Sequence, residues 1–326
     1  MNKKLFFKTL AENKSLAAPL MGFPGIQLSK TNLKTNLFNP RLQAESLMRI
    51  SEFSEVDVVF QMMDLSIEAG ALGLTIEYPT FESPSVKEHP IKTAKDIERF
   101  KNIDIMADCR VCAAAETVKI LKQEQEKPVV AYICGPFSLA GLLIGATEIL
   151  MALFDKPDDV LEIIEFTVKV ELAYAKKLQD AGADAVCLLE PTAMMLPPQD
   201  FMKYAGNAIK NIVTKIDIPA ILHICGNTSH LIDDMCQTGI SALSLDTVID
   251  LSAIMSSQVP DDICVIGNID PANLMLRGTP EEIMQAVKKL KQEMFKFDNF
   301  ILSTGCDLPP DTPLENIKAF VKAAKE

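Results

Sequence analysis

Two residues near the middle of the chain and one near its end have the types and spacing of a metal site. His223 and Cys225 belong to the apolar run 221–225 (ILHIC). If this run is a strand, alternate side chains point to the same side, and these two lie about 7 Å apart along the backbone. Cys306 follows another apolar run, within 303–307 (STGCD). The histidine and cysteine alone are a weak zinc signal, and the distant Cys306 strengthens it.

One imidazole and two thiolates suit Zn2+, and three protein ligands leave the fourth tetrahedral position open. A thiol that entered this position would lose its proton, and the thiolate is the nucleophilic form of sulfur. Two anionic cysteine ligands keep electron density on that sulfur, so it can attack a methyl group. Neutral ligands would suit the activation of water better. The pattern therefore predicts a catalytic zinc site that activates a thiol.

Most of the eight cysteines have a simpler interpretation. Free cysteine is among the most buried residue types. We therefore interpret five cysteines as packing residues inside helices or strands: Cys112, Cys134, Cys187, Cys236 and Cys264.

Eight apolar runs have the length of strands and recur along the whole chain. Runs such as AVCLL and ICVIG are almost continuously apolar, which is typical of a parallel sheet buried on both faces. The predicted strands are 18–22, 72–77, 128–133, 183–190, 220–224, 242–246, 263–267 and 300–304.

Helical patterns separate these strands. The stretch 160–181 has apolar residues largely at helical spacing. Thr279 and Thr312 are each followed by a proline and, three residues on, by a glutamate, which predicts a capped helix start at both places. The stretch 29–65 contains no predicted strand, and we expect it to supply extra N-terminal helices and a loop over the mouth of a barrel.

Eight strand and helix units without a flexible linker or repeat favour a closed (β/α)8 barrel, or TIM barrel, over an open doubly wound sheet. We expect one domain over 1–326, with 1–70 forming an N-terminal helical elaboration and the first strand. In such a barrel the carboxyl ends of all strands open onto one face. This arrangement would bring Cys306 to His223 and Cys225.

Further polar residues stand at the predicted strand ends. Glu190 ends the fourth strand and is either an exchangeable fourth zinc ligand or a cap on the following loop. Asp246 ends the sixth strand, and with Glu190 it is a predicted catalytic residue. Asn268 and Asp270 follow the seventh strand and are predicted to bind the cofactor. Asn227 is predicted to contribute to the same site by contacting a metal ligand and so orienting it.

The charge and hydropathy pattern excludes several classes of protein. The formal net charge is −12, and no basic cluster is present to neutralise the phosphates of nucleic acid or anionic lipid. No apolar run approaches the length that spans a membrane. Lys8 interrupts the apolar N-terminal stretch, so we expect no export signal, reduced cysteines and a cytoplasmic enzyme.

The late part of the chain resembles a known family. The runs 223–246, 266–283 and 301–320 resemble the methylcobamide:coenzyme M methyltransferases, which belong to the uroporphyrinogen decarboxylase superfamily. The resemblance extends to 134–141 (CGPFSLAG) and 182–186 (GADAV), and it is strongest over the last hundred residues.

This resemblance implies a TIM barrel whose zinc is held by a His-x-Cys pair and a distant cysteine, matching His223, Cys225 and Cys306. It also implies the reaction. In the family, zinc binds the thiol of coenzyme M as a thiolate, which takes a methyl group from a methyl-Co(III) corrinoid on a separate small protein. Cobalt leaves as Co(I). The expected partners are thus a small corrinoid protein and a small thiol.

Three alternatives remain open. The sister activity, uroporphyrinogen decarboxylation, relies on an N-terminal arginine-rich motif and an early aspartate, but this chain reads PLMGFPG at 19–25 and TIEY at 75–78. Without arginines, the carboxylates of a tetrapyrrole would lack partners, so we rank this activity lower. Methyl transfer to another acceptor, such as another thiol or tetrahydrofolate, is a second alternative. A non-catalytic corrinoid-binding component is a third.

Overall fold

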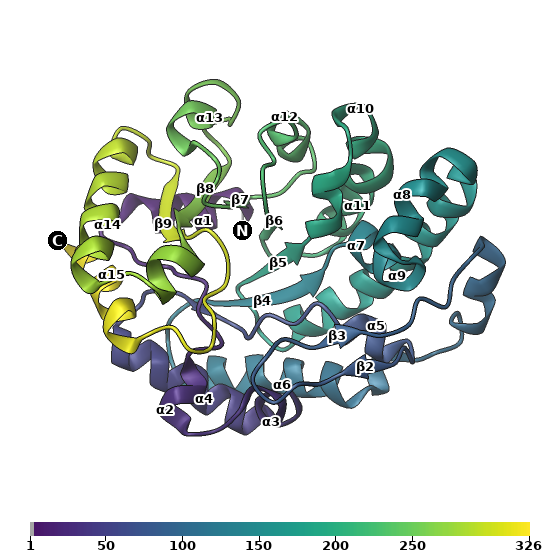
Figure 1. The fold of residues 1–326 in the computed structure, drawn as a ribbon, viewed down its shortest axis with the longest axis horizontal. Helices are drawn as coiled ribbons and strands as arrows, with labels where there is room; N and C mark the ends of the chain where they lie inside the picture. The colour runs from purple at the N-terminus through teal and green to yellow at the C-terminus, as the bar shows by residue number, and fades with distance from the viewer. Residues whose placement is uncertain (1–2) are drawn as a thin grey trace.

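The central element of the fold is a curled parallel sheet (Figure 1), which we describe from a computed structural model covering residues 3–326. Its strands follow the order β1-β4-β5-β6-β7-β8-β9, and helices lie along its outer side. The bounds of the strands are β1 Val59–Phe60, β4 Val129–Cys134, β5 Ala185–Leu189, β6 Ala220–Ile224, β7 Ala242–Leu245, β8 Cys264–Ile269 and β9 Phe300–Thr304.

A short segment near the N-terminus joins the two edges of this sheet. Ala17 forms a parallel bridge with Leu302 of β9. The carbonyl oxygen of Ala17 also accepts a hydrogen bond from the backbone N–H of Asp57, just before β1, at 3.0 Å. The segment thus occupies the place of an eighth strand, and the predicted TIM-barrel fold is confirmed.

Six of the eight predicted strands are confirmed as β4 to β9. The prediction of a strand at 18–22 was wrong, because the isolated bridge to β9 lies one residue earlier, at Ala17, and no strand forms over 18–22. The prediction at 72–77 was also wrong for the barrel, since β2 (Ile76–Glu77) pairs antiparallel with β3 (Ser85–Val86) in a separate small sheet. Strand β1 lies inside the stretch 29–65, which we predicted to contain no strand.

The helices form the outer layer and an N-terminal cover. The predicted helix at 160–181 is confirmed as the 24-residue helix α9. The α-helices are α1 Lys3–Glu12, α2 Gly25–Ser29, α3 Leu33–Phe38, α4 Pro40–Ser54, α5 Ile67–Ala71, α6 Cys109–Glu124, α7 Pro136–Ile144, α8 Ala146–Asp155, α9 Pro157–Asp180, α10 Pro198–Phe201, α11 Asn207–Lys215, α12 Ile232–Cys236, α13 Leu251–Ser257, α14 Pro280–Met294 and α15 Leu314–Lys325.

One of the two predicted helix caps is confirmed. Thr279 forms a complete capping box with Glu282 at the start of α14, and each side chain bonds the backbone N–H of the other residue. The prediction at Thr312 was wrong. Its hydroxyl donates to the carbonyl oxygen of Pro309 instead, and α15 begins at Leu314 without a side-chain cap.

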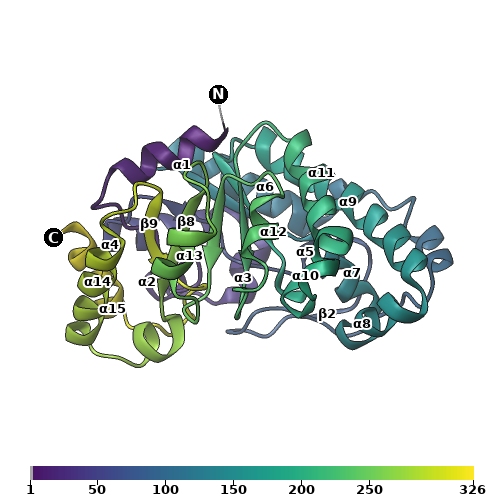
Figure 2. The same ribbon diagram turned by 90° about the horizontal axis from the view of Figure 1, so that it is seen from above.

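The interior of the barrel is filled by alternate strand residues, and α1 closes its amino-terminal end. Phe7 and Ala11 of α1 pack against the interior side chains Val130, Ile221 and Cys264. Figure 2 shows α1 lying along the edge of the molecule at that end of the strands. The amino end is therefore sealed by apolar contacts, which leaves the carboxyl ends of the strands for chemistry.

The packing predicted for cysteines is confirmed at Cys134, Cys187 and Cys264, which are buried. Cys236 is partly buried and packs against the core. The prediction for Cys112 was wrong, because this residue is exposed in the first turn of α6.

Within residues 3–326, no single helix is long and apolar enough to cross a membrane. The bent pair α7 and α8 passes the same test by length and composition when the two helices are taken together.

Candidate metal centre

The predicted ligand atoms of His223, Cys225 and Cys306 come together at the carboxyl-terminal face of the barrel. The Nε2 atom of His223 lies 3.0 Å from the Sγ atom of Cys225 and 3.5 Å from that of Cys306. The two sulfur atoms are 3.5 Å apart. The three ligand atoms lie within 4.8 Å of one another, close enough to share one ion.

Strand geometry explains the position of the histidine. In β6, Ile221 faces the barrel interior, and His223, two residues on, faces the same way because strand side chains alternate. His223 pairs in register with Ser244 of β7. The Ser244 Oγ lies 2.9 Å from His223 Nδ1, so the other ring nitrogen, Nε2, is directed toward the two sulfurs.

A close backbone approach positions Cys306. Gly305 lies against the loop after β7, where a Cβ atom would come within 2.6 Å of the Thr247 nitrogen. Its own N–H donates to the carbonyl oxygen of Ile269 at 2.8 Å. A side chain at position 305 would push this turn away from β7 and would carry Cys306 away from His223.

The two sulfurs interact strongly with each other. Their hydrogen bond lowers the pKa of Cys225 and raises the pKa of Cys306, and partial burial raises the latter further. His223 acts in the opposite direction and favours the Cys306 thiolate. A divalent cation between the three groups would hold both cysteines as thiolates.

The residues fit a zinc ion. Around a tetrahedral zinc ion, nitrogen and sulfur ligand atoms are spaced by about 3.5 to 3.8 Å. The observed spacings of 3.0 to 3.5 Å are slightly shorter. The donor set is borderline soft, and both cysteines are only partly buried, so a fourth ligand can reach the ion.

Glu190 does not join this cluster. Its carboxylate accepts hydrogen bonds from the backbone N–H groups of Phe137, at 3.1 Å, and Ser138, at 2.5 Å, in the first turn of α7. Gly135 permits this contact, since a Cβ there would lie 2.3 Å from Glu190 Oε2. Complete burial raises the pKa of Glu190 to about 7, although the two N–H groups favour its charged form. The side chain thus caps the start of α7, a contact that we did not predict.

Asp246 and Asn268 organise the loops that carry the ligands. Asp246 Oδ2 accepts a 2.9 Å hydrogen bond from the backbone N–H of Gly226, the residue after Cys225. The Asn268 amide donates to the carbonyl oxygens of Asp246, at 2.9 Å, and Ile249, at 2.8 Å. Both side chains therefore hold backbone segments next to the cluster.

The other two predicted binding residues lie in local turns. Asn227 is exposed, and its Oδ1 accepts from the backbone N–H of Ser229 at 3.2 Å. Asp270 caps the turn after β8 by accepting from the N–H groups of Ala272, at 2.8 Å, and Asn273, at 2.7 Å. These contacts account for both side chains through turn formation.

Three residues at the site were missed from the sequence. Ser244 is brought to His223 by the register of β6 and β7, and this register cannot be predicted from a single sequence. Tyr132 of β4 is 3% exposed, and its hydroxyl has no hydrogen-bond partner in residues 3–326. Burial raises its pKa, and the negative charges of Asp307, Cys306 and Cys225 raise it further. Tyr132 and Asp307 therefore place polar atoms close to the ligands.

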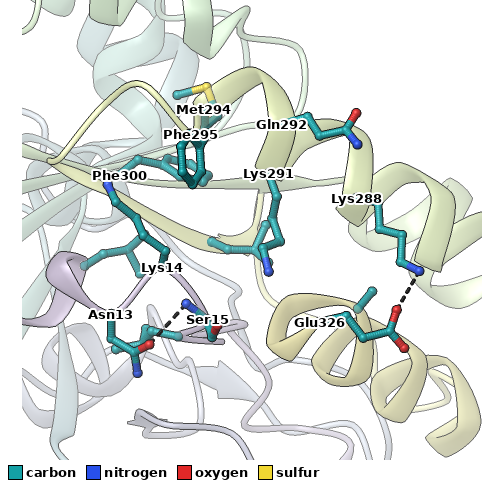
Figure 3. Close-up of a pocket in the computed structure, with 14 residues that line it drawn as sticks. Asn13, Lys14, Ser15, Lys288, Lys291, Gln292, Met294, Phe295, Phe300 and Glu326 are labelled. Carbon is teal, nitrogen blue, oxygen red and sulfur yellow. Dashed lines mark hydrogen bonds and ion pairs between the residues drawn. The ribbon is translucent and has the colours of Figure 1, made fainter.

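One cavity lies away from this cluster. It has a volume of about 750 Å3 and lies at the amino end of β9, lined by Phe300 and Leu302 and by three lysines (Figure 3). These cations already have partners. Lys14 donates to the Phe297 carbonyl, Lys291 to the Ala324 carbonyl, and Lys288 forms an ion pair with Glu326. Because Cys306 follows the other end of β9, this cavity is separate from the metal cluster.

Comparison with known families places the chain in one of them. The uroporphyrinogen decarboxylase (URO-D) family matches residues 25–326. The chain belongs to this family.

Several relatives have been named. The chain is 30% identical over 294 residues to the methylcobamide:CoM methyltransferase MtbA of Methanosarcina mazei, covering 86% of this chain and 84% of the relative. It is 26% identical to the methylcobamide:CoM methyltransferase MtaA of Methanosarcina barkeri, with 88% and 85% covered. It is also 27% identical to a uroporphyrinogen decarboxylase of Prochlorococcus marinus, with 88% and 85% covered.

A solved structure agrees with the fold. A methyltransferase from Methanosarcina mazei superposes with a TM-score of 0.87 at 23% identity, covering 97% of both chains. The family thus includes named methyltransferases and named decarboxylases, and the residues of the site must distinguish them.

Proposed function

We propose that this protein is a zinc-dependent methyltransferase that moves a methyl group from a methylated corrinoid to a zinc-activated thiol such as coenzyme M. The convergence of His223, Cys225 and Cys306 on one point carries the proposal. The names of the relatives supply the donor and acceptor classes, methylcobamide and coenzyme M. The methyl donor would be a corrinoid held on a small partner protein.

The roles of the residues follow from their contacts. His223, Cys225 and Cys306 would hold the zinc ion, which would lower the pKa of the acceptor thiol and keep it nucleophilic. Ser244 fixes the ring of His223 through Nδ1. Asp246 holds Gly226 and hence the backbone next to Cys225. Two anionic sulfurs leave the acceptor sulfur electron-rich, which methyl transfer needs.

Tyr132 offers the acceptor a further contact. Its buried hydroxyl has no partner among the described residues, and a buried polar group without a partner is costly. A polar group on a small thiol would satisfy it. We assign to Tyr132 the role of positioning the acceptor thiol, through a hydrogen bond that its hydroxyl would make to a polar group of the acceptor.

The site argues against decarboxylation of a tetrapyrrole. Leu20, Met21 and Phe23 occupy the segment where the family decarboxylases carry arginines, and all three are buried apolar residues. Glu77 forms an ion pair with Lys87 at the surface. Neither segment offers cations to the carboxylates of such a substrate.

An acceptor screen tests this proposal. The purified zinc-loaded protein is mixed with methylcobalamin and with coenzyme M, another thiol or tetrahydrofolate, and the loss of the cobalt–carbon absorbance is followed. We expect demethylation with coenzyme M, loss of it in Cys306→Ser, and no change in Cys236→Ser, a partly buried cysteine remote from the cluster. Stable methylcobalamin with every acceptor would contradict the proposal, and so would release of carbon dioxide from uroporphyrinogen.

A further inference from the structure

Two exposed cysteines stand three residues apart at the start of helix α6, away from the metal cluster. Cys109 is the first residue of the helix, and Cys112 follows one turn later. Both thiols are free and exposed, unlike the buried Cys134, Cys187 and Cys264. In a helix, residues at this spacing have Cα atoms about 5 Å apart, which lies within the range that a disulfide bridges.

The first turn of α6 is held in place from both sides. The Asp108 carboxylate accepts hydrogen bonds from the N–H groups of Arg110, at 2.8 Å, and Val111, at 3.2 Å. The Arg110 side chain is buried and bonds Asp64 and Tyr78. Because this turn is already ordered, joining the two cysteines costs little further conformational entropy.

The surroundings distinguish the two thiols. The Nζ atom of Lys177, on α9, lies 3.6 Å from the Cys112 sulfur and 2.9 Å from the Met106 carbonyl oxygen. The Lys177 ammonium can therefore donate a hydrogen bond to the Cys112 sulfur, which itself lies 3.3 Å from the same Met106 oxygen. Cys109 instead lies next to the negative Asp108. The difference makes Cys112 the attacking sulfur.

We propose that Cys109 and Cys112 form a redox-active dithiol that exchanges with low-molecular-weight disulfides. The proposal does not depend on the methyltransferase activity. The Cys112 thiolate attacks one sulfur of R–S–S–R, the S–S bond breaks, and the first RS− leaves. Cys109 then loses its proton and attacks the Cys112 sulfur, which releases the second RS−. The two cysteines lose two electrons in all, and the disulfide becomes two RSH molecules that take up the two protons.

Tryptic mapping tests for this bond directly. Trypsin cleaves after Lys101, Arg110 and Lys119, so the two cysteines fall on separate peptides, 102–110 (NIDIMADCR) and 111–119 (VCAAAETVK). The full-length protein is incubated with hydroxyethyl disulfide, quenched in acid, blocked with N-ethylmaleimide under denaturing conditions and digested. We expect these two peptides to be linked, with a mass two hydrogens below their sum, and the link to disappear in dithiothreitol.

Two variants give the controls. In Cys109→Ser, Cys112 should stop at a mixed disulfide with one mercaptoethanol. Lys177→Met should slow the alkylation of Cys112 severalfold, whereas Lys176→Met, an exposed lysine on the same helix, should leave it unchanged. If both cysteines stay free to react with N-ethylmaleimide in excess hydroxyethyl disulfide, and no linked pair forms, the proposal is wrong.

Discussion

Two groups of ionisable side chains lie at the carboxyl ends of the barrel strands, and they differ in what surrounds them. His223, Cys225 and Cys306 converge on one another, and the two cysteines are partly open to solvent while the histidine is buried. Glu68 and Glu171, near the end of β4, are fully buried against each other. A further ligand can approach the two sulfurs of the first group, whereas the second group is closed off from solvent.

The comparison shows that a polar residue at a strand end is not by itself a catalytic residue. Glu190 follows β5 in the place expected for a functional side chain, yet its carboxylate caps helix α7. His223 lies on the neighbouring strand, and its ring meets two sulfurs. What separates the two residues is the direction of the side chain and the ligands that it meets.

The largest expected effect comes from removing a ligand. In His223→Ala we expect loss of the bound metal and a fall in methyl transfer of about a thousandfold or more, since metal-ion catalysis contributes several kcal/mol. Metal analysis and the methylcobalamin assay measure the two effects together. Cys236→Ser is the control, and a variant at position 223 that kept full activity without metal would remove the distinction between the two groups.

The next effect concerns stability, and it comes from the buried acidic group. Burial raises the pKa of Glu68 to about 7, above the ordinary value of 4.5. Glu68 therefore binds its proton more tightly in the folded state than in the unfolded state. The contribution of this side chain to the free energy of unfolding is greatest at low pH, and it is lost as the pH rises toward 7. At pH values above 7, the free energy of unfolding has fallen by about 3 kcal/mol through this group.

Denaturant unfolding at several pH values measures this effect. Glu68→Gln keeps an acceptor for the Cys134 N–H, which bonds Glu68 Oε1 at 2.8 Å, and removes the titration. We expect the variant to lose less stability than the wild type between pH 5 and pH 8. Glu165→Gln, an exposed position on α9, should follow the wild type. A Glu68→Gln curve parallel to that of the wild type would show that the carboxyl pair is not strained by burial.

A smaller effect, on metal affinity, is expected when the hydrogen-bond partner of His223 is removed. Ser244→Ala removes the group that fixes His223 through Nδ1, and the loss of such a partner typically weakens metal binding by about 10- to 100-fold. Competition with a zinc chelator measures the affinity. Ser241→Ala is a matched control, because Ser241 is equally buried but precedes β7. Equal affinity in both variants would mean that the barrel wall alone orients the ring.

Much of this arrangement could be predicted from the sequence. The buried strands β4 to β9 are long apolar runs, so their positions were predictable. The ligand pair His223 and Cys225 has a spacing that strand alternation converts directly into proximity. Thr279 forms the capping box that its local sequence predicts.

The remaining features depend on contacts between distant segments. Strand β1 has two residues and is defined by its pairing with Val129 and Val130, so its own sequence carries little signal. The role of Glu190 depends on the approach of Gly135, and that of Ser244 depends on the register of β6 and β7. None of these contacts leaves a pattern in the local sequence.

The smallest expected effect is at the loop that holds Cys225. Asp246→Asn keeps an oxygen that can accept from the Gly226 N–H but replaces a charged hydrogen bond with a neutral one. The expected cost is about 1 kcal/mol, or less than about tenfold in methyl-transfer rate. Steady-state kinetics with coenzyme M measures it. A loss as large as that of His223→Ala would show that Asp246 acts on the substrate rather than on the loop.

The central claim is that one imidazole and two cysteine sulfurs hold a zinc ion with a place left for the acceptor thiol. X-ray absorption at the zinc edge tests it most directly, on the protein alone and with coenzyme M. We predict two sulfur neighbours at about 2.3 Å and one imidazole nitrogen, with a third sulfur when the thiol is added. A zinc ion surrounded only by oxygen and nitrogen, or a sulfur count that coenzyme M does not change, would contradict the account.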